Sequence, residues 1–190
     1  GADALNYTLA SDVGSTTATI NPKALTVTAL SQTKVYDSNT SVADTTRYSV
    51  GTMVQGESLS GVTLAYSDAN VSRQDGTPTG TVLSNKTIEV SAAQATEGTT
   101  VLSDYVISYV SDTASTITPY AVTVTALSQT KVYDSNTSVA DTTRYNVGAM
   151  VQGESLSAVT LAYDSKDAGT RTITASNAVA GNDTLLSNYN

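Results

Sequence analysis

The sequence predicts an all-β protein made of two tandem β-sandwich (Ig-like) modules in an elongated array. Three observations support this prediction. Residues 24–66 return at 121–163 with 39 of 43 positions identical. Short runs rich in Thr, Val, Ile and Tyr alternate polar and apolar residues, and no helical period persists for three turns. Turn-forming residues separate these runs at intervals of roughly 8–12 residues, as in small β-sandwiches.

The first strand of each copy has the clearest pattern. In residues 24–30, Leu25, Val27 and Ala29 are expected to face one side of the strand, with the intervening threonines on the other, because strand side chains alternate. Residues 121–127 repeat this pattern. Further strands are predicted at 46–53, 61–66, 81–90, 105–110, 115–117, 143–150, 158–163 and 170–175. Turns are predicted around Asp37-Ser38-Asn39, Gln55-Gly56, Asp75-Gly76 and Gly181-Asn182-Asp183.

Two prolines indicate where the modules begin and end. Pro22 and Pro119 lie 97 residues apart at the same place in the repeat, and proline ends a strand ladder and stiffens a connection. The expected units are the final strand of a preceding module at 1–22, a complete module at 23–119 and a second module lacking its last strand at 120–190. The alternative phase divides the chain into 1–103 and 104–190.

Two other features of the repeat bear on the fold. Residues 164–187 of the second copy are 13 residues shorter than the corresponding 67–103, which predicts an exposed loop region that tolerates changes in length. The alternative fold is a β-grasp-like module with one short helix near 51–60.

Composition limits the function. The chain has 9 Lys and Arg against 17 Asp and Glu, a net charge of −8, so it is expected to repel phosphates and not to bind nucleic acid. It contains no His and no Cys, which excludes histidine-based catalytic triads and thiolate or imidazole zinc sites. No stretch approaches the roughly 20 apolar residues of a membrane-spanning helix. The sequence therefore predicts a protein that is not an enzyme and has no membrane span.

Acidic loops are the candidate metal site. Clustered carboxylate and amide oxygens suit Ca²⁺, which is the one cofactor that the sequence suggests. The candidate ligands are Asp37, Asp44, Asp68, Asn70, Asp75, Asp134 and Asp141. The alternative is that these residues form turns and bond to nearby backbone amides.

A covalent cross-link between a lysine and an Asn or Asp, assisted by a carboxylate, is a second candidate. The residues that could take part are Lys34, Glu57, Asp104, Lys131, Glu154 and Asn188. The alternative is a solvated lysine whose aliphatic stem covers apolar surface.

Five short motifs resemble those of a known family, and they follow one another along the chain in the order typical of that family. They are residues 1–9, residues 20–29, Lys34-Val35-Tyr36-Asp37, Gly56-Glu57 and residues 167–170. Together they resemble the YDG/MBG-type repeats of bacterial surface adhesins and filamentous-haemagglutinin-like exoproteins. The glycine that usually follows Tyr-Asp is replaced by Ser38 and Ser135. Serine would be strained there if the turn needs a positive φ.

The resemblance implies a structural stalk or spacer of a bacterial cell-surface or secreted adhesin, extracellular, with a role in cell adhesion or biofilm formation. The implied partners are neighbouring repeats of the same protein and a host or biofilm surface, and head-to-tail strand exchange between copies is a further hypothesis. The alternative function is direct binding of a glycan or protein. Tyr36, Tyr66 and Tyr105 would then stack on the ligand, whereas core packing is the other use for them.

Overall fold

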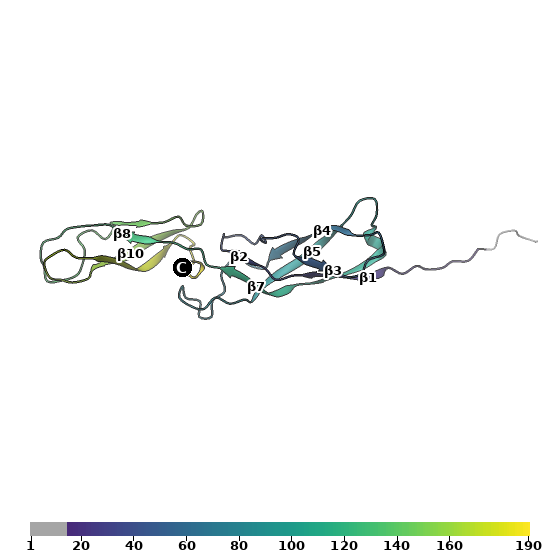
Figure 1. The fold of residues 1–190 in the computed structure, drawn as a ribbon, viewed down its shortest axis with the longest axis horizontal. Helices are drawn as coiled ribbons and strands as arrows, with labels where there is room; N and C mark the ends of the chain where they lie inside the picture. Colours follow the sequence, from purple (N-terminus) through teal and green to yellow (C-terminus); the bar gives the residue numbers. More distant parts are fainter. Residues whose placement is uncertain (1–14) are drawn as a thin grey trace, which may run out of the picture.

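This computed structural model describes residues 15–190 and shows an all-β protein with a sandwich-like fold. Two modules lie end to end along the long axis, and the C-terminus lies beside the joint between them (Figure 1). We call residues 23–118, which contain β1 to β7, the first module and residues 120–190, which contain β8 to β11, the second module. Among the described residues, no helix is long and apolar enough to cross a membrane.

The first module contains seven strands and one short 3-10 helix. In chain order these are β1 (Lys23–Ala29), β2 (Thr33–Val35), β3 (Tyr48–Val50), β4 (Leu59–Tyr66), β5 (Lys86–Ala95), η2 (Leu102–Asp104), β6 (Tyr105–Val110) and β7 (Asp112–Thr118). They form a three-stranded sheet in the order β3-β1-β6 and a four-stranded sheet in the order β2-β7-β5-β4. β1 pairs in parallel with β6, and β2 pairs in parallel with β7. The first two strands therefore need the last two to complete the module.

The core of the first module lies between the two sheets. Leu25, Val27 and Ala29 are at most 3% exposed, which confirms the predicted alternation in β1. The core cluster consists of Val27, Ala29, Tyr36, Leu64, Tyr66, Val71, Ile88, Val90, Ile117 and Tyr189. Because Tyr189 belongs to the second module, the hydrophobic core continues across the joint.

The second module repeats part of this arrangement. Its elements are β8 (Val124–Ala126), β9 (Tyr145–Val147), β10 (Ser155–Tyr163), β11 (Ile173–Gly181) and η3 (Leu186–Asn188). β8 pairs with β9 and β10 with β11, and Tyr120 forms an isolated parallel bridge with Tyr189. Within the described residues, segment 130–132, which corresponds to β2, has no strand partner.

The structure confirms the all-β class and the strand at 105–110, and it corrects other elements. The strand predicted at 81–90 is wrong at its start, because β5 begins at Lys86 and residues 67–85 form a loop. β2 was not predicted. The β-grasp alternative is wrong, since residues 51–58 contain turns and no helix.

The predicted strand at 1–22 lies largely outside the described residues. Those that are described, 15–22, are exposed and belong to no strand. The module boundaries stay a prediction.

Candidate functional site

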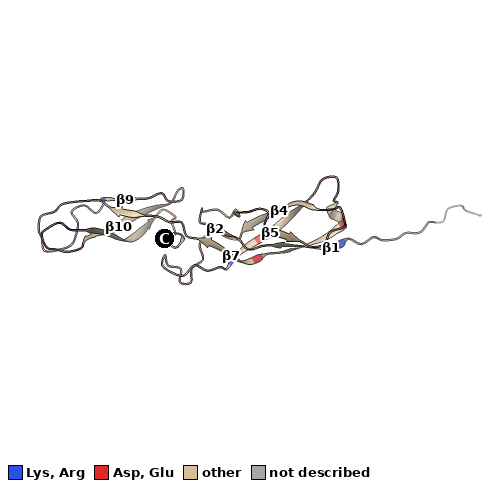
Figure 2. Cartoon of the chain, viewed as in Figure 1, with Lys and Arg blue, Asp and Glu red and all other residues tan. Residues whose placement is uncertain are grey.

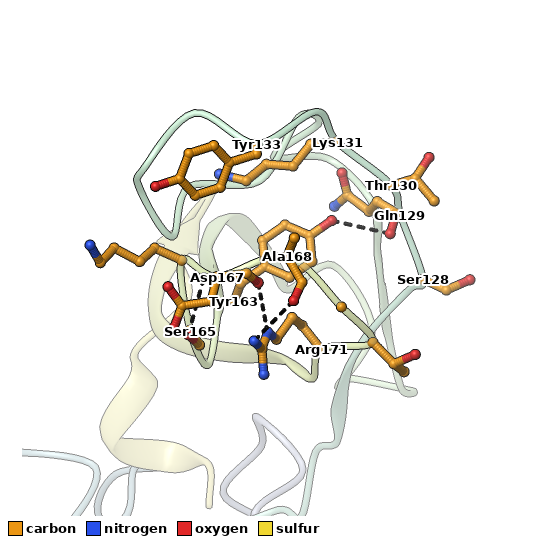
Figure 3. Close-up of a pocket in the computed structure, with 13 residues that line it drawn as sticks. Ser128, Gln129, Thr130, Lys131, Tyr133, Tyr163, Ser165, Asp167, Ala168 and Arg171 are labelled. Carbon is orange, nitrogen blue, oxygen red and sulfur yellow. Dashed lines mark hydrogen bonds between the residues drawn. The ribbon is translucent and has the colours of Figure 1, made fainter.

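A pocket of about 470 Å³ opens in the second module. Its wall is formed by segment 128–133, by Tyr163 at the end of β10 and by turn 165–171, which leads into β11 (Figure 3). Three of the nine basic residues of the chain, Lys131, Lys166 and Arg171, lie in this wall.

Turn 165–171 is held by its own arginine. Arg171 Nε donates to the carbonyl oxygen of Asp167 at 2.8 Å, and Nη2 donates to that of Ala168 at 3.3 Å (Figure 3). Gly169 has a φ of 136°, a backbone conformation that residues with a side chain rarely adopt, so glycine permits the tight connection. The guanidinium therefore stiffens one side of the pocket while it keeps its positive charge.

Lys131 forms the opposite wall. Its ammonium donates to Asp134 Oδ1 at 2.7 Å and to Asn136 O and Oδ1 at 2.7 and 3.0 Å. The bond from Lys131 is the largest cause that lowers the pKa of Asp134. The ammonium also lies 5.6 Å from the centroid of the Tyr163 ring, within cation–π range. The Lys131 side chain is thus fixed at the pocket wall.

Two other side chains of the wall are exposed to solvent. Tyr133 is 60% exposed, and Lys166 is an exposed residue of turn 165–171. No hydrogen bond or ion pair of Lys166 is found within residues 15–190. A ring that can stack and a cation that can pair are the groups that a planar or anionic ligand would contact.

In the first module the same space is filled by strand β7. Gln32, the counterpart of Gln129, donates its backbone N–H to Ser115 Oγ of β7 at 3.0 Å. The Tyr66 hydroxyl donates to Gln32 O at 3.2 Å, as Tyr163 donates to Gln129 O at 3.1 Å. The pocket is therefore the place that a seventh strand occupies in the complete sandwich.

Three of the predicted calcium ligands are engaged by their own turns. Asp44, Asp75 and Asp141 each accept hydrogen bonds from the backbone N–H and hydroxyl of the threonine two residues further on. The hydroxyl bond is the largest cause that lowers the pKa of Asp44 and Asp141. Within residues 15–190 no group of three or more acidic side chains is placed to hold a metal ion. Calcium binding stays a prediction, and the contacts are those of the turn-forming alternative.

Two further candidates, Asp37 and Asp134, pair with the lysines of the proposed cross-link. Lys34 Nζ donates to Asp37 Oδ1 at 2.6 Å, as Lys131 does to Asp134. The residue after each aspartate, Ser38 or Ser135, has a φ of 60°, so this turn does require the positive φ for which glycine is suited.

The remaining two calcium candidates lie near the joint. Asp68 pairs with the buried Lys86 at 2.6 Å, and Asn70 Oδ1 accepts a bond from Asn188 Nδ2 at 3.0 Å.

The residues proposed for a cross-link fall into separate groups. No hydrogen bond of the described residues joins Lys34 or Lys131 to any of the other four. Glu57 accepts from the Tyr105 hydroxyl at 2.5 Å, and Asp104 is exposed. The cross-link stays a prediction.

A cluster of two tyrosines and a carboxylate, which sequence reasoning missed, lies at the joint. Tyr36 of the first module and Tyr189 of the second each donate a hydrogen bond to Glu154, one to each carboxylate oxygen. The two rings lie edge to face with centroids 5.8 Å apart. Glu57 and Tyr105 form the counterpart in the first module. Since Tyr36, Tyr105 and Tyr189 are at most 6% exposed, they serve packing rather than stacking on a sugar.

We expect the contribution of this cluster to the free energy of unfolding to be lost at alkaline pH. Burial, followed by the bond to Glu154, raises the pKa of Tyr36 from 10.0 to about 12. A phenol whose pKa is raised in the folded state stabilises the fold fully below pH 10, and this contribution is lost between pH 10 and 12. We expect the stability difference between the wild type and Tyr36→Phe, measured by thermal unfolding, to fall across that window. A difference that stays constant from pH 9 to 12 would contradict this.

The comparisons with known proteins bear on the second module. The YDG domain family model matches residues 118–190. This match covers less than half of the chain and includes every residue of the pocket. Searches of the curated proteins and of the solved structures found no match.

YDG, in the form SRA-YDG, names the eukaryotic domain that binds DNA and methylcytosine. Read as SRA-YDG, the name of the matched domain conflicts with the identification with bacterial adhesin repeats, and the match over less than half of the chain places the chain in neither family. The stalk function, the adhesion, biofilm and cell-surface role, and the exclusion of nucleic acid are then wrong as well. The alternative of glycan or protein binding and the partners expected from repetition have no support. The extracellular location stays a prediction.

Proposed function

We propose that the chain is a non-enzymatic binding protein, that the pocket of the second module is its site, and that DNA is the partner class. The observation that carries the proposal is the grouping of Lys131, Lys166 and Arg171 with Tyr133 and Tyr163 inside the residues that match the YDG domain. Cations that can contact phosphates and rings that can stack on bases are the groups by which proteins hold single nucleotides.

The charge of the chain restricts how DNA could be bound. A net charge of −8 repels the phosphate backbone, and Figure 2 shows no continuous basic stripe along the two modules. Contact must therefore be confined to the pocket and to a few nucleotides. The site holds three cations, and each neutralised phosphate contributes about −0.9 to the slope of log binding constant against log salt concentration. We therefore expect a slope no steeper than about −3.

The absence of catalysis is proposed on chemical grounds. The chain has no His and no Cys, and Glu154 is engaged by two tyrosine hydroxyls. The carboxylates of Asp44, Asp75 and Asp141 are occupied by their turns. Hydrogen bonds within their turns lower the pKa of each of these three aspartates, whereas general acid catalysis needs a raised pKa.

The proposal can be tested by fluorescence anisotropy. Labelled DNA duplexes with and without 5-methylcytosine, and the same single strands, are titrated with the full chain at about 50 and 150 mM salt. We expect weak binding at the lower salt that Lys166→Ala and Tyr133→Ala reduce. Lys23→Ala removes a charge far from the pocket, in β1, and is the matched control.

Two results would overturn the proposal. One is the absence of binding to any of these DNAs at the lower salt, which would leave the YDG match as a statement about sequence alone. The other is binding that Lys166→Ala and Lys23→Ala reduce equally, which would indicate a general charge effect rather than a site.

A further inference from the structure

The loop between β4 and β5 of the first module, residues 67–85, lies against the C-terminal segment of the second module. Arg73 in this loop donates from Nε to Ser187 O at 2.6 Å and from Nη2 to Tyr189 O at 3.0 Å. Its third nitrogen, Nη1, donates to Gly80 O at 2.8 Å in its own loop. One guanidinium therefore joins the loop to two carbonyl oxygens of the neighbouring module.

A second set of contacts surrounds Asn188. Its side chain is fully buried, with an exposure of 0%. Asn188 Oδ1 accepts from the backbone N–H of Val71 at 2.9 Å, and Nδ2 donates to Asn70 Oδ1 at 3.0 Å. Both polar atoms of the amide are thus satisfied by the loop, which matters because a buried amide without partners is costly.

Asn188 differs from its counterpart in the first module. The sequences Leu186-Ser187-Asn188-Tyr189 and Leu102-Ser103-Asp104-Tyr105 occupy the same place, each a short 3-10 helix followed by a tyrosine. Asp104 is exposed and Asn188 is buried. The neutral amide therefore occurs in the copy whose end is covered by the loop.

The second module has no comparable loop. Strand pairing aligns Tyr66 and Ile88 with Tyr163 and Ile173, so residues 67–87 correspond to residues 164–172. The shorter connection contains no valine, and its one arginine, Arg171, bonds to carbonyl oxygens of its own turn. The additional residues of the longer connection in the first module therefore include those that contact the second module.

We infer that the loop 67–85 is a docking element that holds the second module in a single orientation. Its contacts are made to the backbone at residues 187 and 189 and to the amide of Asn188, and Val71, 6% exposed, packs into the shared core. The contacts that fix the orientation of the two modules are thus made by a loop whose length differs between the copies, and not by the repeated strands. This inference is independent of the proposed binding of DNA.

The test is a distance measurement between the two modules. The chain has no cysteine, so Ser49→Cys in β3 and Asn146→Cys in β9, which are exposed counterparts, take spin labels only where intended. Pulsed electron spin resonance of the full chain should give one narrow distance distribution. We expect Arg73→Met, Asn188→Ala and replacement of residues 67–87 by the sequence of 164–172 to broaden it into many distances.

Arg47→Met is the matched control. Arg47 also donates to a backbone carbonyl, that of Ser31, but within its own module, so its loss should leave the distribution narrow. Arg73→Met decides the test if the loop replacement prevents folding, which far-UV circular dichroism will show. A broad distribution in the wild type, or a narrow one in Arg73→Met and Asn188→Ala, would overturn the inference.

Discussion

Ile88→Ala is expected to lower the free energy of unfolding of the first module by about 2–5 kcal/mol, the cost of truncating a buried aliphatic side chain to alanine. Ile88 is 0% exposed and lies in β5, at the centre of the four-stranded sheet, opposite Tyr66 of β4 and Asp112 of β7. With strands on both sides, the surrounding backbone has little freedom to collapse into the cavity. Urea unfolding followed by circular dichroism measures the loss.

Ile173 provides the matched control for this substitution. It occupies the same register position, opposite Tyr163, but it is only half-buried because no strand covers the other edge of β11 among the described residues. Ile173→Ala should therefore cost clearly less than Ile88→Ala. Equal losses at the two positions would show that the second module closes over Ile173 in solution as β7 closes over Ile88.

Tyr36→Ala should have a comparable effect, acting through the joint. The ring is 4% exposed, lies 5.8 Å from the Tyr189 ring and donates its hydroxyl to Glu154. Removal of a buried aromatic side chain costs about 3–5 kcal/mol, and here it also leaves one oxygen of Glu154 without its donor. Because the core cluster includes Tyr189 of the second module, we expect the wild type to unfold in urea in one step and Tyr36→Ala to unfold in two.

The copy of this residue makes the prediction specific. Tyr133 is 60% exposed, so Tyr133→Ala should change the stability by no more than about 0.5 kcal/mol, as for an ordinary surface substitution. The two substitutions remove the same side chain from the same local sequence. If both lowered stability equally, the effect would come from the local turn and not from contact with Glu154 and Tyr189.

Local sequence was sufficient for much of the fold. The alternation at Leu25, Val27 and Ala29 correctly identified the buried face of β1, and β6 has the predicted bounds, Tyr105–Val110. The strand predicted at 81–90 failed because its first part belongs to the docking loop. β2 has three residues, and its pairing with β7 joins positions more than 80 residues apart, for which a short run gives no local signal.

The sites were harder to predict because they depend on contacts between distant parts of the chain. Tyr36 and Glu154 are 118 positions apart, as are Asn70 and Asn188, and nothing in the neighbouring residues indicates these partners. Asp and Asn drew attention as candidate metal ligands, yet most of them satisfy their own turns. The pocket also escaped prediction, because Tyr133 has the same local sequence as the buried Tyr36 and differs only in what covers it.

The parallel pairing of β1 with β6 has a consequence for synthesis of the chain. β1 leaves the ribosome long before residues 105–110 exist, so it must wait, unpaired, for most of the first module to be made. Residues 121–126, which include β8 and nearly repeat residues 24–29 of β1, emerge soon after β6. Two near-identical strands then compete for one partner, and the wrong choice would exchange strands between modules, a characteristic misfolding route of repeat proteins. The four differences between the copies include Leu25 and its counterpart Val122, inside the segment where this choice is made.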